Sequence, residues 1–552
     1  MNLTSNPLTF LMLLAPAGYA LTAVISWFQP GIRPRATRMA SKFSAGFGIL
    51  ASLGITILFI SKGSMESPLW GFAELGFSLR LDILSLIIYS MISLLGYIIL
   101  HFSINYLDGD SRQGVFLGRL AATLATVQIL VIAGNLALLG FTWVLTSIFL
   151  HRLLVFYPER PLAKIAARKK FIVARMSDIT LFFAFGLLYF LTGTGNLGSI
   201  FSHVTTEYAQ NPSVLIELAA CLLALAAILK SAQFPTHGWL IEVMETPTPV
   251  SALLHAGLLN SGPFLIIRMA QIMEGSTYAP LILLGIGGLT AIIATIAYLT
   301  QTSIKTALGY SSVGHMGFSL MMSGLGLYSA ALLHLVSHSF YKAHAFLSSG
   351  TAVEGIQKGK MQSKKYSPKP WQLGLGFILS LALLGGIGFA FGIDPKQDWG
   401  LLFLGGIMIL GVFQLLSSAL ANSQNPSIFP LVAALSAGLV SIFFVLESFT
   451  HQLIVSQIPA FAEPSSGRIT LASGIILISG LVVLGQLLTL SKPNSPVRLA
   501  WAIHFRNGLY ANAIFDRIVG GLRVPKSANL LKNESKWSEN ESKMKSLEDF
   551  LA

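Results

Sequence analysis

The sequence predicts an all-α polytopic membrane protein with about 15 membrane-spanning helices. Of its 552 residues, 53% are hydrophobic and only 11% are charged, whereas soluble chains carry roughly 25% charged residues. Apolar runs of about 20 residues, long enough to cross a bilayer as a helix, recur along most of the chain. Most basic residues lie between these runs, which is the third sign of a membrane protein.

The expected helices follow the apolar runs in chain order. They cover residues 8–28, 43–61, 81–101, 115–133, 135–156, 171–192, 213–245, 248–273, 279–300, 304–326, 327–350, 371–392, 399–421, 427–448 and 468–490. The first run lacks a basic flank before it and a small-residue cleavage site after it. We therefore expect a retained helix there, not a signal peptide.

Basic residues collect after the first, fifth and eleventh expected helices and in the C-terminal tail. The three internal clusters are Arg33, Arg35, Arg38 and Lys42; Arg160, Lys164, Arg168, Lys169 and Lys170; and Lys358, Lys360, Lys364, Lys365 and Lys369. All follow odd-numbered helices, and the loop 193–212 on the other side has no Lys or Arg. Because cytoplasmic loops are enriched in Lys and Arg, we expect a bacterial inner-membrane protein with its N-terminus outside and its C-terminus in the cytoplasm. Orientation also explains the net charge of +13 without nucleic acid binding.

One expected helix is too long to be continuous. Residues 213–245 would form a helix of about 50 Å, whereas the hydrocarbon core is about 30 Å thick. The stretch "KSAQFPTHGWLIEVMETPTPVSALLHAG" (230–257) places Pro235 and Gly238 just after Lys230. We therefore predict a broken helix, which in transporters marks an ion or substrate site.

Charged and imidazole side chains within the expected spans are costly, by several kcal/mol each. Lys230 follows seventeen largely apolar residues, so proton uptake and release explains it better than snorkelling to an interface. His255 is either a hydrogen-bonded packing residue or part of a proton relay. His334, His338 and Lys342 are spaced i, i+4, i+8 and form one polar stripe. We expect a water-filled proton path there, with zinc binding or structural hydrogen bonding as alternatives.

Each of the other polar residues in or beside the expected spans has two possible roles. Lys305 either joins this path or extends to the cytoplasmic face. Asp178 either forms an i, i+3 ion pair with Arg175 or tunes the lysine at the break through its charge. Glu242 and Glu245 flank the cytoplasmic mouth of the broken helix, where they either feed protons inward or cap the half-helix.

Nothing in the sequence suggests a soluble enzyme's active site. It contains no phosphate-binding loop, no GxSxG motif and no set of cysteines for haem, iron–sulfur or zinc binding. The single cysteine, Cys221, forms neither an internal disulfide nor a cysteine cage. We expect no catalysis, cofactor or metal in this chain.

Three motifs resemble the antiporter-like, proton-pumping subunits of respiratory complex I and of Mrp cation/proton antiporters. They are the stretch 230–257, "QTSIKTALGYSSVGHMGF" (301–318) and "HLVSHSFYKAHAFLSSG" (334–350), and "NGLYANAIFDRI" (507–518) is similar to the end of the largest such subunit. The resemblance implies two inverted five-helix repeats, each with one broken helix. The implied division is 1–110 for N-terminal helices, 111–275 and 276–425 for the repeats, 426–490 for C-terminal helices and 491–552 for a cytoplasmic tail.

The same resemblance assigns roles to individual residues. It implies that Lys230 is a channel lysine and that His255 connects it to a central axis. Lys305, His334 and His338 form that axis, and Asp178 with Arg175 lies beside the channel lysine.

Two departures from the family pattern narrow the expectation. The family has a glutamate after a tryptophan in the fifth span, but Val144 follows Trp143 here; the stretch "GFAFGIDP" (388–395) lacks the family's second channel lysine. We also expect no counterpart of the last span and the lateral helix of the complex I subunit. This pattern is similar to DabB-type membrane subunits of inorganic carbon accumulation complexes, whose partner DabA resembles a zinc carbonic anhydrase.

That resemblance implies a function in inorganic carbon (CO2/bicarbonate) uptake. The membrane subunit would conduct H+ or Na+ down its gradient, and the cytoplasmic partner, which alone would hold zinc, would hydrate CO2. Two alternatives stay open: a proton-translocating subunit of an NADH:quinone oxidoreductase (complex I) relative, or a subunit of an Mrp-type Na+/H+ antiporter.

Overall fold

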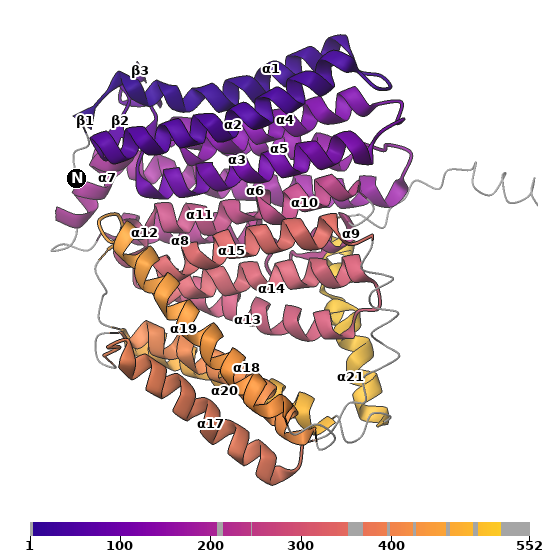
Figure 1. Ribbon diagram of the computed structural model, residues 1–552. Coiled ribbons are helices and arrows are strands. Elements are labelled where there is room, and N and C mark those ends of the chain that lie inside the picture. The colour runs from indigo at the N-terminus through magenta and orange to yellow at the C-terminus, as the bar shows by residue number, and fades with distance from the viewer. Residues whose placement is uncertain are drawn as a thin grey trace, which may run out of the picture.

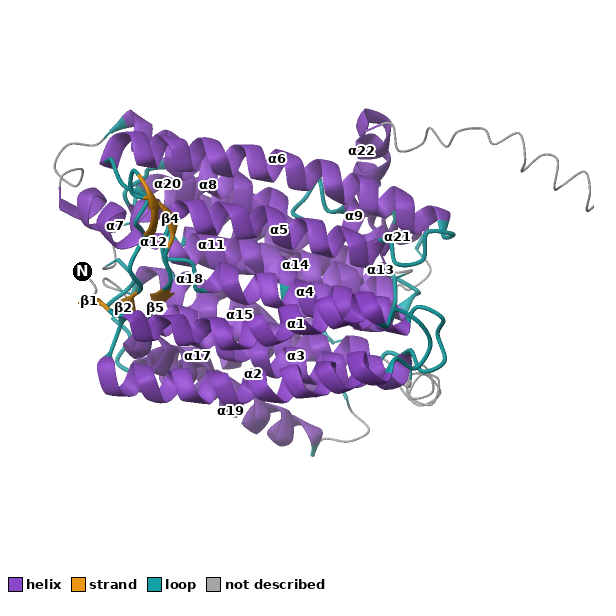
Figure 2. Cartoon of the chain, turned by 90° about the horizontal axis from the view of Figure 1, so that it is seen from above, coloured by secondary structure: helices purple, strands orange, loops and turns teal. Residues whose placement is uncertain are grey.

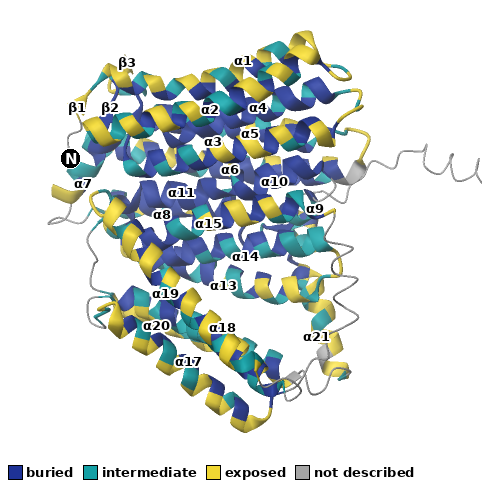
Figure 3. Cartoon of the chain, in the orientation of Figure 1, coloured by how far each residue is buried: buried dark blue, intermediate teal, exposed yellow. Residues whose placement is uncertain are grey.

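The computed structural model is a bundle of long helices packed side by side, with short strands at one end (Figure 1). It describes residues 4–206, 213–243, 246–350, 368–394, 398–422, 427–459, 464–489 and 495–519. The central helices are buried, whereas the outermost helices expose many apolar side chains outward (Figure 3). This distribution suits a bundle that lipid surrounds, because lipid tails are as apolar as the side chains they contact.

The first part of the bundle consists of six long helices. They are α1 (Leu14–Phe28), preceded by the 3-10 helix η1 (Pro7–Leu13), α2 (Arg35–Lys62), α3 (Ile83–Tyr106), α4 (Gln113–Val131), α5 (Leu136–Leu154) and α6 (Pro161–Thr192). α2 and α6 begin before the expected starts at 43 and 171, because basic residues are tolerated where a helix leaves the hydrocarbon core. Pro161 at the first turn of α6 also favours an early start. The four lysines and arginines between 164 and 170, expected in a loop, therefore lie on α6.

Short strands, absent from the all-α expectation, lie at the end of the bundle where α2 ends and α3 begins (Figure 2). Strands β1 (Thr4–Ser5), β2 (Met65–Glu66) and β5 (Arg80–Leu81) form a three-stranded sheet in the order β1-β2-β5, and β3 (Trp70–Phe72) pairs antiparallel with β4 (Leu75–Phe77). α7 (Leu197–Thr206) lies at the same end. Strands of two or three residues are too short to show the alternation that identifies strands in a sequence.

The predicted helix break after Lys230 is confirmed. Helix α8 (Val214–Lys230) ends there, and the chain resumes helical form only in α9 (Gly238–Glu242). Ala232 has a positive φ of 53°, which a helix cannot accommodate. One backbone group freed by the break is hydrogen-bonded to another helix: Phe234 donates its N–H to Thr290 Oγ1 of the helix 278–300 at 3.2 Å.

The following span is also irregular. It consists of α10 (Thr248–Ala256), the 3-10 turn η3 (Leu258–Asn260), α11 (Ser261–Arg268) and α12 (Ala270–Glu274). Three regular helices follow: α13 (Tyr278–Thr300), α14 (Ile304–Gly324) and α15 (Tyr328–Leu347). α13 and α14 pack closely at Gly287, because glycine has no Cβ. A Cβ at this position would lie only 2.6 Å from the carbonyl oxygen of Gly317.

Four tilted helices and a short C-terminal segment complete the structure (Figure 1). They are α17 (Pro370–Ala390), α18 (Trp399–Ala421), α19 (Ile428–Ile454) and α20 (Ser466–Thr489), then α21 (Pro496–Arg506), η4 (Gly508–Tyr510) and α22 (Ala511–Val519). α17 ends at Ala390, within the stretch 388–395 that is similar to the family's second broken helix, and residues 395–397 lie outside the described part of the chain, so the second expected break stays a prediction. α21 and α22 lie at the end of the bundle opposite the strands (Figure 2).

Twelve helices of the described residues are long and apolar enough to cross a membrane. Three further helices are packed between these twelve in the same bundle. They are α8, which has 17 residues, α14, and α15, which carries the polar stripe of His334, His338 and Lys342. The chain is therefore a multi-pass membrane protein. The expected number of about 15 spans and the division into repeats stay predictions.

Candidate ion-translocation site

The amine of Lys230 projects from the end of α8 toward α5. Its Nζ donates to the backbone oxygen of Trp143 at 3.0 Å and to Ser147 Oγ at 2.6 Å. The same amine lies 4.3 Å from the centroid of the Trp143 ring, close enough for a cation–π interaction. A carbonyl, a hydroxyl and an aromatic ring thus surround the lysine where the family pattern has a carboxylate at the position of Val144.

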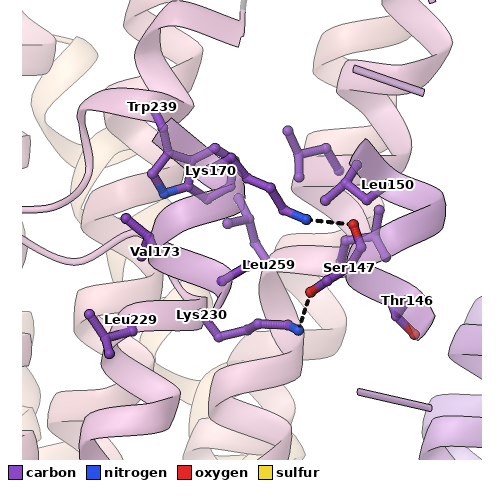
Figure 4. A pocket seen from close by; sticks show the side chains of 12 residues that line it. Thr146, Ser147, Leu150, Lys170, Val173, Leu229, Lys230, Trp239 and Leu259 are labelled. Atoms are coloured by element: carbon purple, nitrogen blue, oxygen red, sulfur yellow. Dashed lines mark hydrogen bonds between the residues drawn. The ribbon is translucent and has the colours of Figure 1, made fainter. Parts of the chain in front are cut away.

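A second lysine, Lys170 of α6, reaches the same serine. Its Nζ donates to the backbone oxygen of Ser147 at 2.7 Å, and the residue is only 5% exposed. Figure 4 shows the two amines converging on Ser147, one from α6 and one from α8. Sequence reasoning missed Lys170 because it assigned the residue to a basic loop. The helix-starting Pro161 is the signal that would have placed it within a helix.

A small cavity of about 20 Å³ lies beside the two amines, enough for one water-sized occupant. Its polar lining consists of Thr146, Ser147, Lys170, Lys230 and Trp239 (Figure 4). The other lining residues are aliphatic, and none of the twelve is an acid. The site is therefore rich in hydrogen-bond donors and has no carboxylate on its wall.

The nearest acid on α6, Asp178, is engaged elsewhere. Its Oδ2 lies 2.6 Å from Arg175 Nη2, as the i, i+3 spacing predicts. The neighbouring Ser177 donates to the backbone oxygen of Ala226 at 2.9 Å, which places this turn of α6 against α8 one turn before Lys230. Asp178 is thus a buried neighbour of the channel lysine's helix, and its suggested influence on that lysine stays a prediction.

His255 lies on the other side of α10 from the lysine cavity. Leu254 lines that cavity, whereas the next residue, His255, stacks on Phe346 of α15 with ring centroids 4.3 Å apart. His255 is fully buried, and neither ring nitrogen has a hydrogen-bond partner among the described residues. Asn260 in the η3 turn donates to Ser339 Oγ at 2.7 Å and holds the irregular span against α15. His255 therefore occupies a position between the broken helix and the central axis.

Three histidines form a cluster on α14 and α15. His315 Nδ1 and His334 Nε2 lie 3.2 Å apart, and the His315 and His338 ring centroids are separated by 5.0 Å. His334 and His338 stack with centroids 6.0 Å apart. The structure brings the two predicted histidines together and adds His315 to them. No group of three His, Cys, Asp or Glu side chains within the described ranges is arranged to hold a metal ion.

The two axis lysines lie toward the cytoplasmic end that the sequence predicts. Lys342, which is fully buried, donates to the backbone oxygen of Leu308 on α14 at 3.1 Å. Lys305, half-buried at the start of α14, lies 3.5 Å from Thr248 Oγ1 at the start of α10. His334, His338 and Lys342 thus follow one face of α15, and Lys305 continues the polar file onto α14.

A larger cavity, of about 760 Å³, adjoins the histidines between α13–α15 and the tilted helices α18 and α20. Its polar lining includes all three histidines of the cluster and Gln414 and Gln486 on the facing helices.

A buried carboxylate that sequence reasoning missed lies further along the same axis. Glu447 of α19, 7% exposed, accepts a hydrogen bond from Ser329 Oγ at 2.7 Å. Ser329 precedes His334 by five residues on α15, a rise of about 7.5 Å along the helix. In the sequence, Glu447 is a lone acid in an apolar run, and this feature could have identified it as a candidate functional residue.

At the opposite end from the strands, the C-terminal segment covers the broken helix. Glu242 Oε1 of α9 lies 2.5 Å from Lys169 Nζ and accepts a hydrogen bond from Asn512 at 2.7 Å. Lys169 also pairs with Asp516 of α22. Glu242 is thus part of a charged contact with the tail, and Glu245 lies outside the described residues.

At the strand end, Asp82 anchors the far part of the irregular span. It caps α3 by accepting the N–H of Ser85 at 2.9 Å, and its other oxygen accepts from Arg80 and from Arg268 of α11. Burial by itself raises the pKa of the Asp82 carboxyl, but the charges and hydrogen bonds of Arg268 and Arg80 outweigh it. The pKa of Asp82 therefore lies well below its usual range.

A helical membrane bundle with a broken helix, a buried lysine at the break and a histidine–lysine axis defines an antiporter-like membrane subunit. Residues 133–367 match the family model described as NADH:quinone oxidoreductase/Mrp antiporter, TM. Residues 71–117 match the model for the NADH-ubiquinone oxidoreductase (complex I) chain 5 N-terminus.

The similar proteins include inorganic carbon transporter subunits and a quinone oxidoreductase subunit. The chain is 34% identical to the probable inorganic carbon transporter subunit DabB2 of Halothiobacillus neapolitanus, over 94% of this chain and 95% of that protein. It is 39% identical to the probable inorganic carbon transporter subunit DabB of Hydrogenovibrio crunogenus, over 59% of this chain and 63% of the relative. It is 32% identical to chloroplastic NAD(P)H-quinone oxidoreductase subunit 5 of Ceratophyllum demersum, over 72% of this chain and 53% of the relative.

Solved structures show the same fold. The structure of the Mrp complex from Dietzia sp. DQ12-45-1b contains a chain with a TM-score of 0.61 at 20% identity; the match covers 98% of this chain and 63% of that one. The chain therefore belongs to the antiporter-like family of membrane transporter subunits that includes the DabB inorganic carbon transporter subunits and subunit 5 of the NAD(P)H-quinone oxidoreductases.

Proposed function

We propose that this protein is the membrane subunit of an energy-coupled inorganic carbon accumulation complex. It conducts H+ or Na+ down its gradient and thereby drives a DabA-like cytoplasmic partner that resembles a zinc carbonic anhydrase and hydrates CO2 to bicarbonate. The similarity to a probable inorganic carbon transporter subunit over almost the whole of both chains carries this proposal.

The residues suggest a route for the ion. Lys230 exchanges a proton at the helix break, where a carbonyl and a hydroxyl accept its hydrogen bonds. His255 relays charge past α10 to the axis of Lys342 and His338 on α15. Intramembrane ionisable groups serve proton relays in other transporters because each can change its protonation state without leaving its helix.

The missing acid partner at Val144 is consistent with downhill conduction. In a pump that moves ions against a gradient, a carboxylate beside the channel lysine can change the charge state of that lysine through its own negative charge. Here Ser147 accepts the amine's hydrogen bond but carries no charge. Such a site suits a conduit that couples ion entry to work in a partner.

Partner identity separates this proposal from the alternatives. The complex is purified through a tag on this chain from the native bacterium, and its subunits and metal content are determined. A zinc-containing cytoplasmic subunit supports inorganic carbon accumulation. Quinone-module subunits indicate the complex I alternative, and a full set of antiporter subunits indicates the Mrp alternative.

The role of Lys230 is tested in the same strain. Lys230→Ala should abolish growth at low CO2, with the complex still assembled in the membrane. Lys164→Ala, which changes an exposed lysine of α6, is the matched control and should grow normally. Normal growth of the Lys230→Ala strain removes this lysine from the mechanism.

A further inference from the structure

We infer that the cavity between Lys170 and Lys230 binds a small monovalent anion of about chloride size, which acts as an exchangeable counter-ion in place of the carboxylate missing at Val144. The cavity has a built polar wall from three elements, α5, α6 and the α8–α9 break. The inference stands apart from the proposed function, because anion binding requires neither transport nor a partner subunit.

Hydrogen-bond donors exceed acceptors on this wall. Lys170 makes one hydrogen bond and Lys230 makes two, whereas each ammonium group carries three N–H donors. The indole N–H of Trp239, a buried lining residue, has no partner within the described part of the chain. Several N–H groups thus remain for one acceptor that could enter the cavity.

The local charge balance also favours an anion. Two lysines approach one serine, and like charges repel each other strongly in an apolar interior. Asp178, the acid on the adjacent face of α6, is paired with Arg175, so this pair adds no net negative charge. No acid lines the cavity, and His151, one turn beyond Ser147 on α5, supplies no negative charge either. A bound anion would neutralise one of the two ammonium groups.

The size and walls of the cavity restrict the occupant. A volume of about 20 Å³ accommodates one atom or a group of water size. Aliphatic side chains, including Leu150, Leu254 and Leu258, form the remainder of the wall and strengthen the charge interactions by excluding water. Halides fit best by size, and bicarbonate, which carries the same charge, would require a shift of the lining side chains.

The test measures thermal unfolding of the purified full-length chain in detergent at constant ionic strength. Sodium gluconate is the reference, and sodium chloride, sodium bromide and sodium bicarbonate are the probes. Binding to the folded state should raise Tm by a few degrees in chloride or bromide relative to gluconate. A larger rise in bicarbonate than in the halides would support the site and identify inorganic carbon as its occupant. Equal Tm values in all four salts would overturn the inference.

Matched variants locate the effect. Lys170→Met removes a donor while keeping an unbranched side chain, and it should abolish the anion-dependent rise; Lys164→Met, on the exposed face of the same helix, should retain it. Trp239→Phe, which removes the indole N–H donor and replaces the indole by a smaller aromatic ring, should weaken the response and serves where Lys170→Met fails to fold. Val144→Glu supplies a fixed carboxylate on α5 and should eliminate the response with the lysines intact. An unchanged anion response in all three cavity variants refutes the site.

Discussion

Lys230 and Ser147 form a 2.6 Å hydrogen bond between α8 and α5, at the residue where α8 ends. Ser147 lies three residues beyond Val144 and therefore on nearly the same face of α5. The channel lysine thus keeps a partner on the helix that carries the family's glutamate, but the partner is neutral. A neutral acceptor holds the amine in position without fixing its protonation state.

Removing this acceptor should impair ion movement and stability. Ser147→Ala leaves one donor of the buried Lys230 amine without its partner, which should lower the free energy of unfolding by about 1–3 kcal/mol. Ion flux into membrane vesicles containing the complex should fall as well. Ser436→Ala on α19 is the control, because the buried Ser436 hydroxyl makes no hydrogen bond to any described residue and lines neither cavity. Equal flux in both variants argues against a role for Ser147.

The tail should detach when its charged contact is broken. Lys169, which is buried, joins Glu242 of α9 to Asp516 of α22. Lys169→Met leaves both acids without their shared cation, and removing one member of a buried charge group costs about 3–5 kcal/mol. Limited trypsin digestion, followed by mass spectrometry, should show faster cleavage after Arg506 and Arg517 in this variant. Arg168→Met, which changes the exposed neighbour, should be cleaved at the wild-type rate.

Glu447 should exchange protons at one end of the histidine axis. The predicted topology places this end of the axis on the outer side of the membrane. Glu447→Gln keeps the shape and the hydrogen bond from Ser329 but cannot exchange a proton at physiological pH. Ion flux should fall by at least about a hundredfold, the lower end of the range for loss of a proton-transfer group, while the thermal unfolding temperature stays close to that of the wild type. Ser329→Ala removes the hydrogen bond but keeps the acid, so it should retain most of the flux. A flux loss in Ser329→Ala that matches Glu447→Gln indicates a structural role instead.

The Asp82 cluster should matter for stability over a defined pH range. Asp82→Asn leaves Arg80 and Arg268 without their shared carboxylate and should destabilise the protein by roughly 3–5 kcal/mol. The folded-state pKa of Asp82 lies below its unfolded value, so its stabilisation is present above the unfolded value of about 3.9 and is lost as pH falls toward the folded value. Thermal unfolding should therefore show the same difference from wild type at pH 7 and pH 5.

The control for this cluster is an exposed ion pair. Asp108 pairs with Arg33 at 3.1 Å at the surface, and such pairs contribute about 0–1 kcal/mol. Asp108→Asn should therefore leave the unfolding temperature almost unchanged. A wild-type-like Asp82→Asn protein would show that the cluster is not an anchor of the irregular span.

Local features of the sequence were sufficient for several parts of the site. Long apolar runs predicted the membrane helices, and the proline and glycine after Lys230 predicted the break, because backbone geometry depends on neighbouring residues. The i, i+4, i+8 spacing placed His334, His338 and Lys342 on one face of a helix, and the i, i+3 spacing paired Asp178 with Arg175. Each of these conclusions requires only the period of a helix.

Contacts between helices required the tertiary structure. Sequence reasoning placed Lys170 in a loop and passed over Glu447. Pro161 and the lone acid in an apolar run were signals for a helix and for a buried polar group, but neither signal identifies the partner on the facing helix. Ser147 meets Lys230 across 83 residues of sequence, and Lys169 meets Asn512 across 343. The sequence by itself determined the membrane class, the family and the break. Packing alone decided which polar groups replace the missing acid, because packing brings side chains from distant helices within hydrogen-bonding distance.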